Sequence, residues 1–554
     1  MKSIWFESRS PMQADAFEQD CSYDVVVVGA GLTGLTTALL LSRGGLNVAV
    51  LEARTLGAVT TGNTTAKLSL LQGTVLSGIR RHFSEEIVQA YVEGNREGQA
   101  WMLRYLKEQK VAVQRRDAYS YATSDSGRAT LEREAQVARA AGLEASFVED
   151  VALPYPTRGA LRLPEQAQFH PMEVLEALAT DLRSRGARIV QGVRVRDVSV
   201  GTRATVHTDQ GTNQAQHVIL ATGTPILDRG LYFAKLEPSR SYAAAYRIPV
   251  ASAALPRGMY LSVDQPPRSL RTVPVDGEEL LVVGGNGHPV GKPISEQAKV
   301  ADLDQWTRQW FEGAEPTHHW SAQDYRSANM VPFVGKLPRG GGNIHVATGY
   351  NKWGMTNAVA AALSLSADIL GGNIPWAQTL SHRITGATDL VEGARINAAV
   401  AGKLAKGWLG AVFNDEDDSR RRHGHPEAPE AVPGPAGHDE PENENQQPGQ
   451  QSSSSTSGTG QDAPGEGEGR ISRRGLLPIA VSTVGDRTCR VSGVCTHLGG
   501  ILSWNDAEKS WDCPLHGSRF SFDGQLLEGP ATQDLKMFDA DDAPTPEVPA
   551  GPES

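Results

Sequence analysis

Two short stretches near the end of the chain each contain one cysteine and one histidine, a combination that can bind metal. They are Cys495–Thr496–His497 and Cys513–Pro514–Leu515–His516, with fifteen residues between them. Thiolates and imidazoles are ligands both for zinc and for iron–sulfur clusters. Zinc fingers usually keep their cysteine pair and histidine pair apart, whereas each stretch here supplies one of each. The mixed arrangement favours a [2Fe–2S] cluster with two cysteines on one iron and two histidines on the other.

The two stretches, "CTHLG" and "CPLHGS", resemble the cluster-binding loops of Rieske iron–sulfur proteins. Both loops have the spacing of that family, and the likeness extends from about residue 470 to residue 538. The resemblance implies a small all-β domain at 471–538. It also implies which residues bind the cluster: Cys495, His497, Cys513 and His516.

The chain departs from the Rieske pattern in two ways. Many family members have a disulfide that braces the loops, but Gly500 and Leu515 occupy its two positions here. Respiratory members place a serine and a tyrosine to hydrogen-bond the cluster; Ser518 matches the serine, whereas Phe520 stands at the tyrosine position. Fewer donors stabilise the reduced cluster less, so we expect a reduction potential below that of respiratory members.

A glycine pattern near the other end of the chain indicates a dinucleotide site. Residues 25–28 form an apolar run typical of a buried parallel strand. Gly29, Gly31 and Gly34 follow as G-x-G-x-x-G, and a second apolar run ends at Glu52. The glycines let the backbone approach a pyrophosphate, a helix N-terminus stabilises its charge, and the acid can hold ribose hydroxyls.

Later stretches favour FAD over NAD. "GVRVRDV" around Val195 and "HVILATGTPI" around Thr222 look like the adenine-side strand and the closing strand of FAD domains. A helix starting near Trp353 would place its N-terminus beside the flavin, and "TTGNTTAKLS" at 60–69 fits a loop along it. Together these stretches resemble the FAD-dependent D-amino-acid-oxidase-like flavoproteins over about residues 22–375.

This resemblance implies an α/β FAD-binding, Rossmann-like body at 22–410 with an inserted α+β substrate domain. The FAD-binding segments are expected at about 22–80, 170–225 and 330–375, and the substrate-domain segments at about 81–169 and 226–329. The residues expected to bind FAD are Gly29, Gly31, Leu32, Thr33, Gly34, Glu52, Ala53, Arg54, Thr61, Gly62, Thr64, Thr65, Val195, Ala221, Thr222, Gly223, Gly349, Trp353, Gly354 and Met355.

A second glycine cluster, "LLVVGGNGHPVG" at 280–291, could be a site for NADH. We interpret it instead as a strand and turn of the substrate domain, because an amphipathic helix follows rather than a strand ending in an acid.

Residues that orient a substrate are harder to identify. Flavin oxidation of an amine or a hydroxy acid can proceed by hydride transfer without a dedicated base, so the protein mainly positions the substrate. An arginine can clamp a substrate carboxylate with two hydrogen bonds. The candidates for this catalytic positioning are Arg240, Tyr242, Tyr325 and Arg326.

Charge and composition suggest how the two parts are joined. The net charge of the 554 residues is −11, and the segment 414–470 alone has thirteen acidic residues and four arginines. That segment is rich in proline, glycine and serine, so we expect a disordered linker there and a disordered tail at 539–554. The nearly neutral remainder has no basic patch for nucleic acid. Four cysteines, no signal peptide and no apolar run of 18 residues favour the cytoplasm without a membrane span.

These features predict an oxidoreductase with two cofactors. A small amine, amino acid or hydroxy acid would be oxidised at FAD, and a Rieske cluster would pass the electrons to an external acceptor. The linker would let the cluster domain visit both flavin and acceptor, and each cofactor would be held independently. An alternative is a flavin oxidase whose Rieske domain is a redox sensor or docking domain. A Rieske oxygenase is disfavoured because the body has no H-x-x-x-H iron site.

Overall fold

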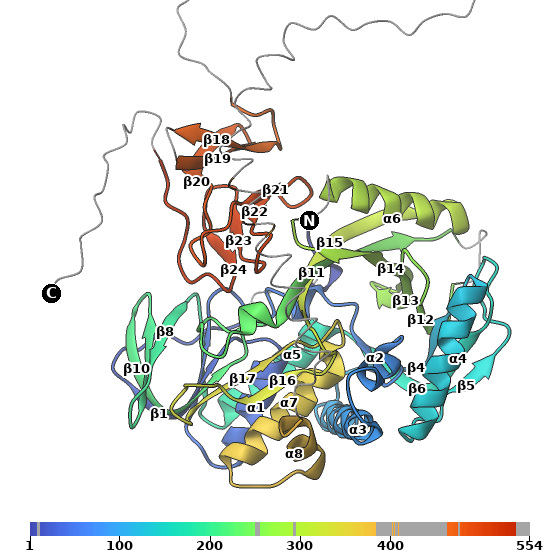
Figure 1. Ribbon diagram of the computed structural model, residues 1–554, viewed down its shortest axis with the longest axis horizontal. Coiled ribbons are helices and arrows are strands. Elements are labelled where there is room, and N and C mark those ends of the chain that lie inside the picture. Colours follow the sequence, from blue (N-terminus) through green and yellow to red (C-terminus); the bar gives the residue numbers. More distant parts are fainter. Residues whose placement is uncertain are drawn as a thin grey trace, which may run out of the picture.

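The computed structural model has a large N-terminal body and a small C-terminal β domain that lies on it (Figure 1). The expected linker lies outside the described residues as far as residue 462, and the expected tail at 539–554 lies outside them entirely. The described residues are 1–7, 12–249, 255–291, 295–383, 402, 404, 408, 463–474 and 477–538.

The first sheet of the body is mostly parallel. Its strands lie in the order β16 (Phe333–Lys336), β17 (Ile344–Thr348), β10 (Gly211–Leu220), β1 (Ser22–Val28), β2 (Val48–Glu52) and β7 (Arg188–Gln191), and a hairpin of β8 (Val195–Ser199) and β9 (Ala204–Thr208) joins it at β10. Val25 and Val27 of β1 enter one core, and Val26 and Val28 enter another. Both faces of β1 are buried, which explains its unbroken run of valines.

Helices cover one face of this sheet (Figure 1). They are α1 (Leu32–Arg43), α5 (Pro171–Ser184) and α7 (Gly354–Ile369), and α3 (Glu85–Glu108) packs against α7. A Cβ at Gly98 of α3 would lie 2.8 Å from the Thr356 carbonyl oxygen of α7, so this glycine permits the two helices to pack closely. Part of the segment expected in the substrate domain, 81–169, therefore packs on the FAD-binding part. The other helices are α2 (Val75–Arg80), α4 (Asp125–Ala140), α6 (Glu296–Trp310) and α8 (Pro375–Ser381), with short 3-10 helices η1 (Ile4–Phe6), η2 (Thr61–Asn63) and η3 (Tyr232–Ala234).

The second sheet of the body is largely antiparallel. Its order is β15 (Glu315–Ser327), β11 (Leu236–Arg247), β14 (Glu278–Pro289), β13 (Arg268–Val275), β12 (Met259–Ser262), β4 (Val113–Tyr121), β6 (Ala160–Phe169) and β3 (Lys67–Leu68), with β5 (Ser146–Val148) paired to β6. The glycine cluster at 280–291 lies largely in β14, between β11 and β13. The expected α/β body with an inserted α+β domain is therefore confirmed.

The C-terminal domain is all-β, as expected. One sheet contains β18 (Gly469–Arg474), β19 (Leu477–Val484) and β20 (Arg487–Ser492), and the other contains β21 (Ser503–Asn505), β22 (Ser510–Asp512), β23 (Arg519–Ser521) and β24 (Leu526–Glu528). Because β18 begins at Gly469, the last two residues of the expected linker 414–470 belong to this domain; the glycine–glutamate run before the strand conceals its start. Strand β24 lies beside the body (Figure 1). Within the part of the chain that the structure describes, none of the helices has the length and apolar character needed to cross a membrane.

Candidate flavin and cluster sites

The glycine-rich turn after β1 forms one wall of a cavity in the body. Gly29 has φ +105°, and a Cβ there would lie 2.6 Å from the Ala221 carbonyl oxygen. A Cβ at Gly34 would lie only 1.9 Å from the Gly29 carbonyl oxygen. Glycine is therefore required at both positions, where the turn, the helix and the neighbouring strand approach most closely.

The N-terminus of α1 opens onto this cavity. Its N-cap residue, Gly31, has no side chain to cap the helix, and both Gly31 and Leu32 line the cavity. The Leu32 N–H donates to Thr61 Oγ1 at 3.1 Å. A helix start of this kind, free of acidic residues in its first turn, favours an anion such as a pyrophosphate.

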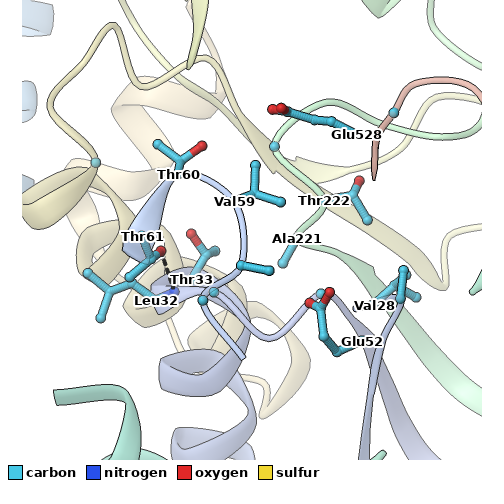
Figure 2. Close-up of a pocket in the computed structure, with 18 of the residues that line it drawn as sticks. Val28, Leu32, Thr33, Glu52, Val59, Thr60, Thr61, Ala221, Thr222 and Glu528 are labelled. Carbon is cyan, nitrogen blue, oxygen red and sulfur yellow. Dashed lines mark hydrogen bonds between the residues drawn. The ribbon is translucent and has the colours of Figure 1, made fainter. Parts of the chain in front are cut away.

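Glu52 braces the turn from the end of β2. Its carboxylate accepts the Ala30 N–H at 2.8 Å and the Arg54 N–H at 2.9 Å. Burial raises the pKa of Glu52, and the two backbone donors oppose that rise. Since a carboxylate has about four acceptor sites, it retains the capacity to hold ribose hydroxyls. We call Gly29, Gly31, Leu32, Thr33 and Glu52, which share this cavity (Figure 2), the N-terminal wall.

The structure brings most of the residues expected at FAD around this one cavity. Gly34 lies behind the turn, Gly62 packs on Phe6, and Thr65 and Trp353 line a neighbouring cavity instead. The expected residues that line the cavity are Gly29, Gly31, Leu32, Thr33, Glu52, Ala53, Arg54, Thr61, Thr64, Val195, Ala221, Thr222, Gly223, Gly349, Gly354 and Met355.

The opposite wall of the cavity comes from the C-terminal domain, which the sequence reasoning missed. Figure 2 shows Glu528 above Thr222, across the cavity from Glu52. No local motif marks the stretch "EGPATQDL" at 528–535 as part of a flavin site. Four residues form this surface, which we call the C-terminal wall: Leu527, Glu528, Gly529 and Ala531.

A second cavity adjoins the first and shares Thr60, Thr64, Asp324, Lys352 and Met355 with it. Lys352 donates from Nζ to Ser241 Oγ at 2.7 Å, and burial lowers its pKa. The backbone N–H of Lys352 donates to the Asp324 carboxylate at 2.5 Å. Lys352 was not among the expected site residues, because one lysine in a loop carries no recognisable pattern.

Three of the four catalytic candidates line these cavities. Tyr242 lies in the second cavity, with its hydroxyl 3.2 Å from His288 Nε2. Arg326 also lines it, half exposed and 3.7 Å from Glu237. Tyr325 lines the first cavity instead, and its hydroxyl donates to the Gly529 carbonyl at 3.0 Å.

Arg240, the fourth candidate, is not placed to bind a substrate. Its side chain is 1% exposed and contacts the Glu508 carboxylate of the C-terminal domain. Its Nε lies 3.7 Å from Asp512, and Ser321 and Gln323 accept hydrogen bonds from its guanidinium. The expectation of a substrate clamp was wrong because the partners of Arg240 lie in a distant part of the sequence.

The four expected cluster ligands meet at one end of the C-terminal domain. The rings of His497 and His516 lie edge to face, 5.1 Å apart. A hydrogen bond between the sulfurs of Cys495 and Cys513 lowers the pKa of Cys495 to about 7. Nδ1 of His497 is buried and has no hydrogen-bond partner among the described residues, so it is available as a ligand.

These four side chains form two pairs, Cys495 with Cys513 and His497 with His516, rather than one coordination shell. Among the residues that the structure describes, no three His, Cys, Asp or Glu side chains are grouped closely enough to hold a single metal ion. A [2Fe–2S] cluster of the Rieske type uses one pair on each iron. The donor set therefore fits that cluster.

The surroundings of the ligands explain the two departures from the Rieske pattern. A Cβ at Gly500 would lie 2.7 Å from Leu515, so these residues are packed together where relatives have a disulfide. Ser518 hydrogen-bonds to the Cys495 sulfur, while Phe520 is fully buried and offers no hydroxyl.

The cluster ligands face the body of the protein. His497 Nε2 lies 3.1 Å from Asp228 Oδ1, and the His516 ring packs edge to face on Phe233 at 5.4 Å. Gln323 donates to the carbonyl of Gly517, next to His516, at 2.7 Å. The C-terminal domain is thus seated on the body, which differs from the independent, tethered module expected from the linker.

Comparisons with known proteins match both parts of the chain. A family model described as FAD dependent oxidoreductase (DAO) matches residues 24–367, and one described as Rieske [2Fe-2S] domain matches residues 466–539. A Bacillus subtilis protein, YhfW, whose name describes it as a Rieske 2Fe-2S iron–sulfur protein, is 29% identical over 98% of each chain. The cytochrome b6-f complex iron-sulfur subunit of Chlorobaculum thiosulfatiphilum is 37% identical over 11% of this chain and 34% of its own.

Solved flavoenzymes share the fold of the body. Glycine oxidase from Geobacillus kaustophilus has a TM-score of 0.54 at 20% identity and covers 66% of this chain and 100% of its own. L-proline dehydrogenase from P. horikoshii has a TM-score of 0.53 at 16% identity and covers 64% and 95%. The chain therefore belongs to the DAO family of FAD-dependent oxidoreductases, with FAD and a [2Fe–2S] cluster in a C-terminal Rieske domain as its cofactors.

Proposed function

We propose that the protein oxidises a small amine, amino acid or hydroxy acid and passes the electrons through the Rieske cluster to an external acceptor. When bound, FAD supplies a two-electron acceptor and the cluster a one-electron carrier. The observation that carries the proposal is the shared wall: Gly529 and Ala531 line the FAD cavity, and Ala531 also contacts Ser518, two residues from the ligand His516.

Two hydrogen-bonded connections across that wall support a short electron path. The Ala531 N–H donates to Ser518 Oγ at 3.0 Å, and Ser518 hydrogen-bonds to the ligand Cys495. On the other side, Gln323 donates to Tyr325 at 3.0 Å and to the carbonyl of Gly517 at 2.7 Å. Each connection begins at a residue of the FAD cavity and ends at or beside a cluster ligand.

The second cavity suits a small substrate with an anionic group. The Lys352 ammonium lies where the two cavities meet, so it could hold a carboxylate beside the flavin. Burial strengthens such a charge pair because less water screens it. Tyr242 and Arg326 add a hydroxyl and a second cation to the lining. Solved structures with this fold include proteins named glycine oxidase, L-proline dehydrogenase and L-amino acid deaminase, which supports an amino-acid substrate.

A cytoplasmic location remains part of the proposal. All four cysteines are free, as expected for a reducing compartment, and two of them are proposed cluster ligands.

The proposal is tested by reducing the flavin without oxygen. A panel of amines, amino acids and hydroxy acids is mixed anaerobically with the holoenzyme, and the absorbance of flavin and cluster is followed together with the EPR signal of the reduced cluster. We expect the flavin to bleach and the cluster to become reduced afterwards. A cluster that stays oxidised beside a reduced flavin would favour the alternative, an oxidase whose Rieske domain is a sensor or docking domain.

Two variants sharpen this experiment. Cys513→Ser should lose the cluster signal, and the flavin should still be reduced by substrate if the variant retains FAD. Lys352→Met should raise the KM for carboxylate substrates more than for amines that lack a carboxylate, whereas Lys336→Met, an exposed lysine, should change neither. An equal effect of Lys352→Met on both substrate types would contradict its role as the carboxylate partner.

A further inference from the structure

The FAD cavity is built by two domains that are far apart in the sequence. The N-terminal wall belongs to the first sheet and α1, whereas the C-terminal wall belongs to β24 and the loop after it. Figure 2 shows Glu528 facing the cavity together with Glu52 and Thr222. A cofactor in this cavity would therefore contact both domains at once.

The C-terminal wall is attached to the body by contacts made by cavity residues themselves. Arg194 lines the cavity and donates from Nη2 to the Leu526 carbonyl at 2.8 Å. Tyr325 lines it on another side and donates to the Gly529 carbonyl at 3.0 Å. Both acceptors are backbone carbonyls that flank Glu528. Each domain thus holds the other where the cofactor lies.

The rest of the interface lies outside the cavity. Glu508 accepts hydrogen bonds from Arg240, from Ser321 at 2.7 Å and from Arg519 at 2.9 Å. Further away, Asp506 accepts the Ser295 hydroxyl at 2.5 Å and the Gln297 N–H at 2.9 Å, at the N-terminus of α6. None of these residues lines the cavity, so they can be changed without altering a cofactor contact.

We propose that the Rieske domain is a structural part of the FAD site, so that FAD binding and docking of this domain stabilise each other. A ligand that contacts both domains binds the docked arrangement more tightly than the undocked one. Thermodynamic linkage then makes the effect reciprocal. Undocking lowers the affinity for FAD by a certain factor, and loss of FAD lowers the docking equilibrium constant by the same factor. This inference concerns binding alone and stands whether or not electrons pass from flavin to cluster.

The first test loosens docking and measures FAD. Glu508→Lys places a third cation beside Arg240 and Arg519, whereas Glu468→Lys makes the same charge change on the exposed β18 side of the Rieske domain. The affinity for FAD is measured from the fluorescence of released flavin, and the cluster absorbance reports whether the domain is folded. We expect Glu508→Lys to weaken FAD binding about tenfold, within the roughly 5- to 150-fold usual for coupled sites, and Glu468→Lys to leave it unchanged.

A second variant keeps the test valid if Glu508→Lys loses its cluster, because Glu508 also pairs with Arg519 within the Rieske domain. Asp506→Lys removes the interdomain contact at α6 without breaking that internal pair. A variant that keeps its cluster, exposes the 526–531 loop to hydrogen exchange and binds FAD like the Glu468→Lys control would overturn the proposal.

The reciprocal test uses the unmodified full chain. FAD is removed, and hydrogen exchange is measured at the 526–531 loop, at the N-terminus of α6 and at β20. Faster exchange at the loop alone reflects lost cofactor contact, but faster exchange at α6 as well reports undocking, because α6 does not line the cavity. We expect both to exchange faster and β20 to stay protected. Unchanged exchange at α6 would show that FAD does not hold the domains together, whatever the electron-transfer experiment gives.

Discussion

The two walls of the FAD cavity are held in place by different kinds of interaction. The N-terminal wall depends on backbone sterics within one strand–turn–helix unit, where Gly29 and Gly34 leave no room for a side chain. The C-terminal wall depends on side chains that cross a domain interface, among them the pair of Arg240 and Glu508. We infer that the glycine packing of the first wall is insensitive to solution conditions, whereas the second wall responds to charge, pH and cofactor.

The largest effect should come from breaking the N-terminal wall. A Cβ at residue 34 would meet the Gly29 carbonyl oxygen at 1.9 Å, and a backbone atom cannot move aside without disrupting the turn. Gly34→Ala should therefore cost more than about 4 kcal/mol and abolish FAD binding. Gly372→Ala, where a Cβ meets nothing closer than 3.5 Å, is the matched control. FAD content and thermal unfolding are measured for both variants. Normal FAD content in Gly34→Ala would contradict the packing argument.

The next largest effect should come from breaking the Arg240–Glu508 pair of the interface. Arg240→Met leaves the buried carboxylates of Glu508 and Asp512 with Arg519 as their remaining cation, at a cost of about 3–5 kcal/mol, as for other broken buried pairs. Arg247→Met on the same strand removes an exposed pair with Glu278 and should cost less than about 1 kcal/mol. Urea unfolding measures the free energy of unfolding of the two variants. If both variants lose the same amount, the interface pair is no stronger than a surface pair.

A smaller effect should follow from pH, because two buried acids titrate at the interface. Burial raises the pKa of Glu296 to about 7, with Asp512 and Asp506 raising it further and Arg240 opposing them. Burial likewise raises the pKa of Glu528 to about 7, opposed by Arg519 and Arg240 and supported by Asp512 and Glu508.

The sign follows from these raised values. An acid whose pKa is raised in the docked structure contributes full stability below its ordinary value, 4.5 here, and loses that contribution as the pH rises through about 7. Docking should therefore be weaker at pH 8.5 than at pH 6. Glu296→Gln together with Glu528→Gln should flatten the dependence, as measured by hydrogen exchange at the 526–531 loop. Tighter docking at pH 8.5 than at pH 6 would contradict the assignment of the pH dependence to Glu296 and Glu528.

The smallest effect should come from a single hydrogen bond across the cavity. Tyr325→Phe removes the donor to the Gly529 carbonyl and should cost about 1 kcal/mol, or a few-fold in FAD affinity. Tyr119→Phe, on β4 of the second sheet and outside both cavities, is the comparison. If the two variants bind FAD equally, Tyr325 does not link the walls.

Sequence reasoning predicted what short contiguous segments determine. The turn from Gly29 to Glu52 and the two cluster loops are local arrangements, so their residue types and spacing are visible in the printed chain. The resemblance to known flavoproteins and Rieske proteins then indicated both folds and both cofactors. The structure agrees on the folds and brings the expected cluster ligands together at one place.

The remainder depends on how two folded domains pack, which spacing does not encode. Arg240 looks like a substrate clamp until Glu508 is placed beside it, and no motif near Glu528 indicates that it lines the flavin cavity. Lys352 gains its position from a loop in which its φ is +69°, a conformation that its residue type does not announce. The acidic segment at 414–470 suggested independent domains because composition describes a linker and not the surfaces that it joins.

The contact between Asp506 and the start of α6 has a consequence for synthesis on the ribosome. Asp506 follows its partner Ser295 by 211 residues, so the helix is made long before the carboxylate that holds its first turn. At about 5–20 residues per second, the gap amounts to roughly ten to forty seconds. During that interval Ser295, whose hydroxyl accepts the Ala298 N–H at 3.0 Å, must cap the helix alone. Until the Rieske domain has been made, this face of the nascent body therefore lacks the contact that Asp506 later supplies.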